Sequence, residues 1–196
     1  VVSGPAFARS LAVTSYTAAG VLRWQQTVSP VAGTFVGSWI AAAPNGDFVA
    51  VGANIDSRGS VFGVTMVRYA SDGTFQWRID STGTILSMGR LVVDAGGNAY
   101  LSYNSTLYKY SPTGTLLWST YTSVPDGGAA LSPDGVELVL TGVPRGGSNW
   151  TTATFSTATG TRKWLVTAAE GISATDLVVD NGRVYVTGQG YTGAGT

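Results

Sequence analysis

One unit occurs four times in this chain: an aromatic residue, a short turn ending in glycine, and a tryptophan four residues after that glycine. The interval from glycine to tryptophan is the same in every copy, although the last copy has one extra residue before its glycine. A unit that returns every ~40–50 residues is typical of propellers and solenoids. The copies are Tyr16, Gly20 and Trp24; Tyr69, Gly73 and Trp77; Tyr110, Gly114 and Trp118; and Phe155, Gly160 and Trp164.

The second copy shows why this unit predicts a β-hairpin. Apolar and polar side chains alternate over Met66–Tyr69 and again over Phe75–Arg78. The Ser-Asp-Gly sequence between them is a turn sequence, because glycine adopts a positive φ at little steric cost. Alternation on both sides of such a turn indicates two antiparallel strands with one buried face. We expect the tryptophan to anchor neighbouring sheets, and ligand stacking is its alternative use.

A second hairpin pattern alternates with the first along the chain. It consists of an apolar run, a turn with Asn-Gly, Asp-Gly or Gly-Gly, and another run of strand-forming residues. These dipeptides between apolar runs are strong hairpin signals. The four copies lie at residues 40–52, 91–102, 130–142 and 176–188.

Together the two hairpins make a meander of four antiparallel strands, which we name A, B, C and D in chain order. Four strands in ~40–50 residues, repeated, are the signature of a β-propeller blade. The predicted fold is therefore all-β, a propeller of about four blade equivalents within one domain, residues 1–196. The predicted parts are a partial blade at 1–28, blades at about 36–82, 86–122 and 127–168, and a partial blade at 172–196.

The two ends of the chain resemble the same blade strand. Val1–Gly4 is similar to strand B at Tyr185–Gly188, so the chain is expected to open on a strand B and to finish after another. If the ring closed on itself, the last A and B strands would complete the first C–D pair. The other interpretation, which we favour, is a segment of a larger propeller. Open edges of such a segment invite association with other chains or with the rest of the ring.

Composition argues against several classes of function. The 196 residues include no cysteine and no histidine, and 11 basic residues balance 11 acidic ones. The chain therefore lacks thiolate chemistry, cysteine-based zinc sites and histidine acid–base catalysis. No basic patch predicts a nucleic-acid partner, and no apolar run approaches the ~18 residues of a membrane span. We expect no cofactor and no metal ion.

The carboxylates are spread over the turns rather than gathered at one site. Residues of this kind in turns normally bond to their own backbone, which is the role expected of Asp47, Asp72, Asp94, Asp134 and Asp180. The loop from Asp56 to Ser60 could hold calcium, but it lacks the ligand density of a dedicated calcium loop.

The units resemble the bacterial β-propeller repeat family and, more distantly, quinoprotein-type propellers. The resemblance is carried by Asp-x-x-Gly-Asn-x-Tyr at residues 94–100, by Tyr-Val-Thr-Gly at 185–188, and by the aromatic–glycine–tryptophan unit. Residues 159–164 are similar to the tryptophan-docking motif of quinoproteins, which implies a tryptophan that locks adjacent blades. The aspartate that this motif carries upstream is Ser156 here. Since this fold hosts many functions, the resemblance is informative about fold more than about activity.

The resulting expectation is a non-enzymatic scaffold or interaction module of a secreted or cell-surface bacterial protein, extracellular or periplasmic. One alternative is a carbohydrate-binding, lectin-like propeller. The other is a segment of a larger propeller enzyme whose catalytic residues lie outside this chain. Possible ligand-binding residues are Trp39 and Trp150, together with Asp56 and Arg58 in a loop between strands B and C. Loops on a rigid scaffold are where binding sites usually lie, but the sequence does not say whether the partner is protein or glycan.

Overall fold

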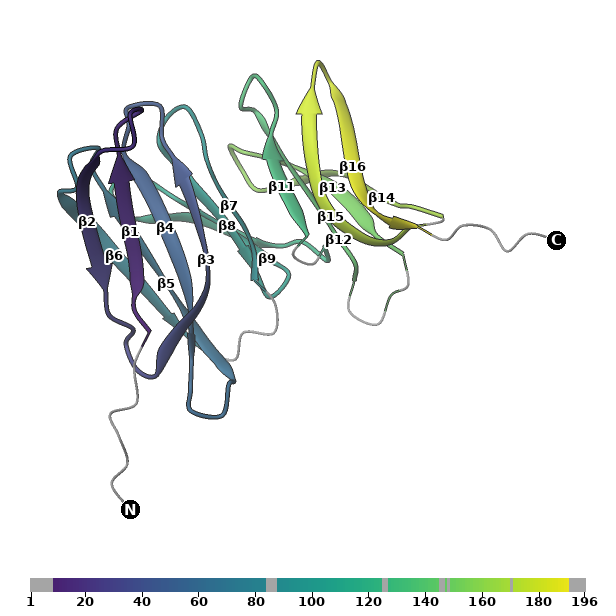
Figure 1. Cartoon of the computed structure of the whole chain (residues 1–196). Helices are drawn as coiled ribbons and strands as arrows, with labels where there is room; N and C mark the ends of the chain where they lie inside the picture. Colours follow the sequence, from purple (N-terminus) through teal and green to yellow (C-terminus); the bar gives the residue numbers. More distant parts are fainter. Residues whose placement is uncertain are drawn as a thin grey trace. The chain divides into compact units, whose positions relative to one another are not determined.

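The computed structural model describes residues 9–83, 88–124, 127–144, 147, 149–169 and 171–190. These residues form sixteen β-strands, labelled in Figure 1, and no helix. It follows that the described part of the chain contains no helix able to cross a membrane. The chain divides into two compact units, Val1–Ile85 and Leu86–Thr196.

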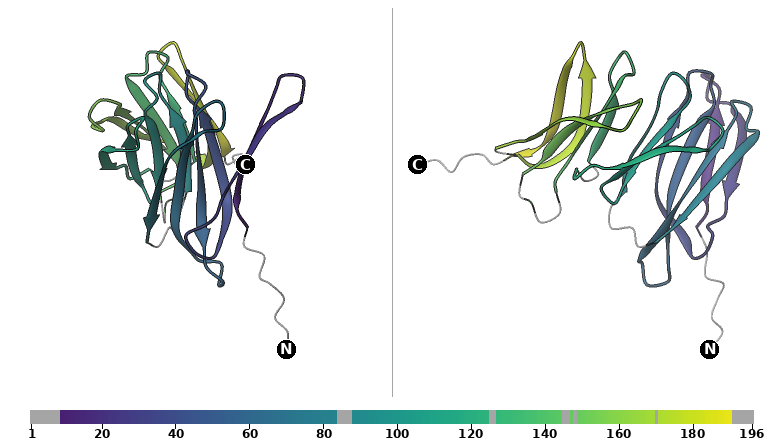
Figure 2. Two further views of the ribbon diagram at one scale, coloured as in Figure 1. Left: turned by 90° about the vertical axis from the view of Figure 1, so that its left-hand side faces the viewer. Right: turned by 180° about the vertical axis from the view of Figure 1, so that it is seen from behind.

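The first unit contains a two-stranded and a four-stranded sheet, both antiparallel. The strands of the small sheet are β1 (Leu11–Tyr16) and β2 (Leu22–Val28). The larger sheet has the order β3-β4-β5-β6, and Figure 2 shows its strands side by side from two further directions. Its strands are β3 (Thr34–Ala42), β4 (Phe48–Ile55), β5 (Val61–Tyr69) and β6 (Phe75–Thr82).

The second unit contains two four-stranded sheets and a two-stranded one. The first sheet is built from β7 (Met88–Val93), β8 (Ala99–Tyr103), β9 (Thr106–Tyr110) and β10 (Leu116–Tyr121). The next is built from β11 (Gly128–Leu131), β12 (Glu137–Gly142), β13 (Thr151–Ser156) and β14 (Arg162–Thr167). The last pair is β15 (Gly171–Asp180) and β16 (Arg183–Gly190). Strand β11 contacts both β7 and β15, so the first strands of the three sheets are neighbours.

Each four-stranded sheet is a meander in which strands consecutive in sequence are hydrogen-bonded neighbours. The predicted fold class, all-β with four-stranded antiparallel sheets, is therefore confirmed. In blade terms β1–β2 is a C–D pair and β15–β16 is an A–B pair, by their place in the repeat. The strand predicted at Val1–Gly4 lies outside the described residues.

The C–D turns form because the same two backbone hydrogen bonds close each of them. In the second copy the Ala70 amide donates to the Thr74 carbonyl at 2.8 Å, and the Gly73 amide donates to the Ala70 carbonyl at 2.9 Å. Gly73 has a φ of 89°, in the left-handed region that favours glycine. Equivalent pairs of bonds close the turns at Gly20, Gly114 and Gly160.

A β-bulge follows every one of these turns, and it explains the constant glycine-to-tryptophan interval. In all four C–D pairs the register shifts by one residue just before the tryptophan. Each tryptophan is the third residue of its strand D, in β2, β6, β10 and β14. A bulge re-aims the side chains of the strand that carries it, so a fixed turn and a fixed bulge give each indole the same place on its hairpin. The bulged residues are Arg23, Gln76, Leu117 and Lys163.

The apolar cores lie between stacked sheets. Leu11, Val13 and Val28 of the small sheet pack with Phe48 and Val67 of the β3–β6 sheet. The second unit has an equivalent core, in which residues of β8 and β9 meet residues of β12 and β13. Strand β5 is buried on both faces over most of its length, contrary to the single buried face that its alternation predicts.

Candidate interaction surfaces

In the first unit, a tryptophan joins one sheet to the glycine turn of the next. The Trp24 indole nitrogen donates to the Ser71 carbonyl at 3.2 Å. The indole lies so close to Gly73 that a Cβ added there would be 2.9 Å from the ring. The ring also stacks on Phe48, with centroids 5.2 Å apart. The Trp24 indole can therefore pack against this turn only because position 73 has no side chain.

The second unit repeats this arrangement at the same repeat positions. The Trp118 indole nitrogen donates to the Thr157 carbonyl at 3.3 Å. A Cβ added at Gly160 would lie 2.8 Å from the Trp118 ring. Ser71 and Thr157 both stand two residues after the aromatic of their repeat, Tyr69 and Phe155. One rule therefore describes both units: the tryptophan of a sheet packs on the glycine of the following C–D turn.

Among the described residues, the turn glycine of the first repeat has no tryptophan packed on it, and the tryptophan of the last repeat has no turn glycine to pack on. Gly20 has a φ of 78°, like the other turn glycines, yet nothing lies within 4 Å of the position of a Cβ there. Trp164 is 39% exposed. Tyr16 is 60% exposed, whereas Tyr69 and Phe155 are 4% and 0% exposed at the same repeat position.

Among the described residues β1 pairs only with β2, and an open groove lies beside it. It has a volume of about 150 Å³ and is lined by Leu11, Val13 and Thr14 on one side and by Trp39 and Ile40 on the other. Ile40 is exposed, although it is an isoleucine in the middle of a strand. A second groove, of about 180 Å³, continues along β1 toward Arg9. The edge of β1 and the facing part of β3 thus leave an open space lined by both polar and apolar groups.

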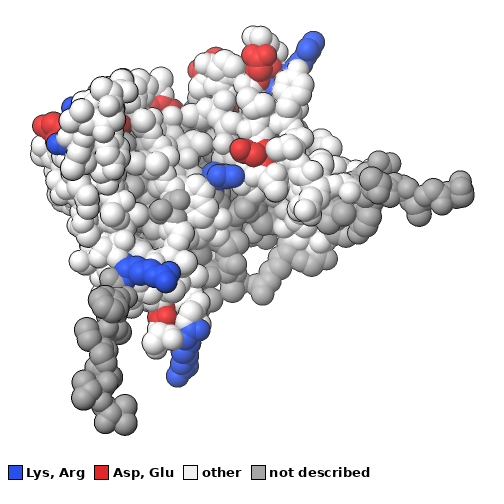
Figure 3. All heavy atoms as spheres, viewed as in Figure 1, with Lys and Arg blue, Asp and Glu red and all other residues white. Residues whose placement is uncertain are grey.

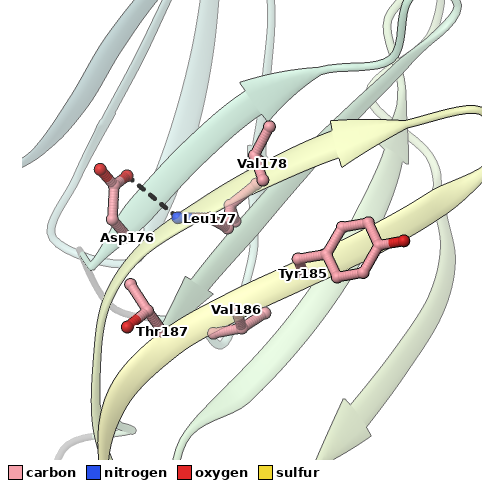
Figure 4. Close-up of a pocket in the computed structure, with 6 residues that line it drawn as sticks. All are labelled: Asp176, Leu177, Val178, Tyr185, Val186 and Thr187. Carbon is pink, nitrogen blue, oxygen red and sulfur yellow. Dashed lines mark hydrogen bonds between the residues drawn. The ribbon is translucent and has the colours of Figure 1, made fainter.

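The β15–β16 pair exposes an apolar face of its own. Val178 and Tyr185 are opposite each other in the pairing and share this face with Asp176 and Thr187 (Figure 4). These four residues, with Leu177 and Val186, line a groove of about 240 Å³. Tyr185 is 50% exposed, whereas Tyr100 at the same repeat position is 1% exposed. The other side of the pair is covered, since Leu177 is buried and β15 contacts β11 and β12.

Charged groups are sparse on the molecular surface. Figure 3 shows a few blue and red groups, some of them side by side, among mostly uncharged atoms on the face in view. Among the described residues no group of three or more His, Cys, Asp or Glu side chains is placed to hold a metal ion.

The most buried charge pair supports an A–B turn instead of lining a pocket. The Arg68 guanidinium, 2% exposed, contacts the Asp47 carboxylate at 3.1 Å. Gln76, a bulged residue, donates to the same carboxylate oxygen at 3.1 Å. Burial raises the pKa of Asp47, but hydrogen bonds with Asn45, Arg68 and Gln76 outweigh it and hold the pKa below 3.8. Asp47 is therefore an ionised structural carboxylate at neutral pH.

Replacing Asp47 by Asn should make the stability of the protein less sensitive to acid. Because the folded-state pKa of Asp47 is below its unfolded value, its charge stabilises the fold above about pH 4, and this contribution is lost as the pH falls through the folded-state value. At pH 7 the Asp47→Asn variant should lose about 2 kcal/mol, from weaker charge-assisted hydrogen bonds. Urea unfolding at pH 7, 5 and 3 measures this. A gap between the two proteins that stays constant down to pH 3 would contradict it.

Other turn carboxylates have the same structural role. Asp94 accepts hydrogen bonds from the Asn98 amide group at 2.8 Å and from the Tyr100 hydroxyl at 2.9 Å. Burial raises the pKa of Asp94, and these bonds bring it below the usual value. The carboxylate of Asp134 accepts from the Ser132 hydroxyl at 2.6 Å, which lowers its pKa. Asp72 accepts from the Thr74 amide at 2.8 Å. Asp72, Asp94 and Asp134 accept hydrogen bonds from backbone amides of their own turns, as expected. The Asp47 carboxylate differs from this expectation, because it accepts from the side chains of Arg68 and Gln76.

The possible ligand residues do not gather into one pocket in the described structure. Asp56 closes its own loop, accepting from the amides of Arg58 at 2.8 Å and Ser60 at 2.9 Å. Trp39 lies in the middle of β3, opposite Val51, and lines the groove along β1. Trp150, in the other unit, precedes β13 and is half-buried.

Sequence reasoning missed two features. The buried pair of Arg68 and Asp47 was not predicted, because the alternation of β5 places Arg68 on a solvent face; the signal was an arginine beside an acidic turn in one blade. The apolar face of Val178 and Tyr185 was not predicted either, because its residues read as ordinary strand residues. Only comparison with the buried Tyr100 at the same repeat position distinguishes it.

The chain resembles solved propeller structures at low sequence identity. BamB from Moraxella catarrhalis is 16% identical with a TM-score of 0.60, and the match covers 91% of this chain and 53% of that one. The Dos1 propeller is 12% identical with a TM-score of 0.59, covering 87% of this chain and 45% of that one. An exo-beta-1,3-galactanase from Phanerochaete chrysosporium is 12% identical with a TM-score of 0.52, covering 91% and 49%.

The comparisons establish the fold and nothing finer. No protein-family model matches the chain, and no curated protein matches it. The chain spans about half the length of the three solved structures named above. At these identities the likeness is one of fold, and the matches include an enzyme. The fold of this chain is that of a β-propeller, matched over about half of each longer chain.

Proposed function

We propose that this chain is a non-enzymatic interaction module built on β-propeller blades of the bacterial, quinoprotein-like repeat type. It acts in an exported or cell-surface protein, as a scaffold that binds another macromolecule through uncovered sheet surfaces. The observation that carries the proposal is the contrast between Tyr185, which is half exposed, and Tyr100, which is buried at the same repeat position. An apolar sheet face left open in this way is typical of a surface that binds a protein partner.

The state of the carboxylates supports a role other than acid–base chemistry. A general acid needs a raised pKa near the working pH. The pKa values of Asp47, Asp80 and Asp94 are instead lowered by hydrogen bonds that outweigh the effect of burial. Each of these groups is engaged in holding a hairpin or neighbouring strands together.

A glycan array distinguishes this function from the lectin-like alternative. The interaction module should bind no glycan above background, for the wild type and for the Trp39→Ala and Trp150→Ala variants alike. Glycan binding by the wild type that is lost in either variant would overturn the proposal and favour a sugar site at that tryptophan. The two tryptophans serve as controls for each other because they lie in different units.

The enzyme alternative is tested on the coding sequence. If this chain belongs to a longer propeller enzyme, an uninterrupted reading frame around it should encode further blades with histidine or cysteine at strand ends. Intact mass of the natural protein, compared with the 20.2 kDa of this chain, shows whether those blades are present in the product. An interaction module requires neither residue.

A further inference from the structure

We propose that the β15–β16 pair of one copy of this chain completes a propeller blade with the β1–β2 pair of a second copy. The inference rests on the proposed function and names the partner of the uncovered surfaces. Strands A and B of this blade come from the second unit of one copy, and strands C and D come from the first unit of the other.

The strand edges are complementary. In every four-stranded sheet, strand B pairs with strand C, as β4 does with β5 and β12 with β13. In the described residues β16 is a strand B without a strand C, and β1 is a strand C without a strand B. An unpaired edge presents a row of free backbone donors and acceptors, and a matching edge satisfies them.

The register follows from the repeats. The residue two positions after the A–B turn glycine lies opposite the aromatic of strand C in two sheets: Phe48 opposite Tyr69, and Ala99 opposite Tyr110. Val184 has the place of Phe48 after its turn glycine, and Tyr16 has the place of Tyr69. The same pairing therefore sets Val184 opposite Tyr16, and Val186 opposite Thr14.

This register places the exposed face of the β15–β16 pair in one copy against the groove beside β1 in the other copy. Val13 lies in the core that faces the β3–β6 sheet. The residue opposite Val13 would be Thr187, which shares its face with Tyr185 and Val178. These side chains would enter the groove beside β1, against Ile40. The exposed apolar surface of both units would be buried, as it is at the equivalent places inside each unit.

The tryptophan rule gives a further, independent match. In both units a tryptophan packs on the glycine of the next C–D turn. With β1–β2 of a second copy beside β16, the following turn after Trp164 is the one at Gly20. Gly20 has open space where Gly73 and Gly160 have an indole, and Trp164 is exposed.

Two copies are enough to pair the open β1 and β16 edges of both chains. Head-to-tail contacts of this kind either close into a ring or continue as a filament. In a closed pair of copies, each copy therefore supplies one half of each of the two completed blades.

Cysteine cross-linking tests the contact directly, because the chain has no native cysteine. The Thr14→Cys and Val186→Cys variants are purified separately, mixed and oxidised. They should form a disulfide-linked product of twice 20.2 kDa. The control mixes Thr14→Cys with Thr187→Cys, a shift of one residue that places the two Cβ atoms on opposite faces of the sheet. About tenfold less linked product is expected for the control.

Three further results decide the proposal. Light scattering of the wild type should give a mass near twice that of one chain, and Trp164→Ala should weaken association at least about tenfold.

A monomer at all concentrations, or equal cross-linking in the control, overturns the proposal. A Thr14→Cys/Val186→Cys double variant that links only within one chain overturns the second copy as partner. These failures leave the interaction-module function standing, whereas glycan binding would overturn that function whatever the mass.

Discussion

Replacing Trp118 by alanine should lower the free energy of unfolding by about 3 kcal/mol. The substitution removes the indole that packs on Gly160, and with it the hydrogen bond to the Thr157 carbonyl. Trp118 also packs against the core that joins two sheets of the second unit. Because the cavity would lie between sheets held by backbone ladders, little of it can collapse. Urea unfolding followed by circular dichroism measures the change without relying on tryptophan fluorescence.

The matched control for this variant is Trp164→Ala. Trp164 occupies the same place on its strand D but is 39% exposed. Measured at a concentration where the chain is monomeric, this variant should lose about 1 kcal/mol or less, since little apolar surface returns to water. Equal losses for the two variants would mean that the tryptophans stabilise their own hairpins and do not lock neighbouring sheets.

Replacing Gly160 by alanine should lower the free energy of unfolding by about 3 kcal/mol, from two separate causes. The φ of 72° costs a residue with a Cβ about 1–2 kcal/mol. The added methyl group would also lie 2.8 Å from the Trp118 ring, and overpacking of this kind typically costs about 1–3 kcal/mol. Urea unfolding of the variant gives the sum of the two effects.

The second cause is isolated by Gly135→Ala, in the same sheet. Gly135 has the same φ of 72°, but nothing lies within 4 Å of its Cβ position. This variant should therefore lose only the backbone part, about 1–2 kcal/mol. If Gly135→Ala were as destabilising as Gly160→Ala, the contact with the indole would contribute nothing.

The strands, turns and sheet order could be predicted from the sequence because their signals are local. Turn dipeptides such as Asn181-Gly182 mark the A–B hairpins, and each C–D turn is closed by backbone bonds at the expected glycine. The bulge before each tryptophan was not predicted, although its cause was visible. A constant interval from glycine to tryptophan requires a constant local backbone path, and the bulge is part of that path.

Contacts between sheets were less predictable, because they depend on residues far apart in sequence. Arg68 lies on a strand whose alternation indicates a solvent face, yet its side chain is buried beside Asp47. The exposed faces of the β1–β2 and β15–β16 pairs could not be predicted for the opposite reason. Tyr16 and Tyr185 have the same residue types as their buried repeat-mates, and only the absence of a neighbouring sheet among the described residues leaves them exposed.

The reading of Trp39, Trp150, Asp56 and Arg58 as ligand residues stays a prediction. Asp56 forms two backbone hydrogen bonds within its own loop. Trp39 stands beside the groove that we assign to a second copy. If that assignment holds, Trp39 contributes to binding through protein contact and not through stacking on a sugar.

The most direct test of the central claim, that each tryptophan locks onto the glycine of the following turn, is a double-mutant cycle on Trp118 and Gly160. The steric part of Gly160→Ala exists only while the indole is present. In the Trp118→Ala background, the additional loss from Gly160→Ala should therefore fall to about 1–2 kcal/mol, the backbone part alone, giving a coupling energy of about 1–2 kcal/mol. Strict additivity of the two substitutions would contradict the claim.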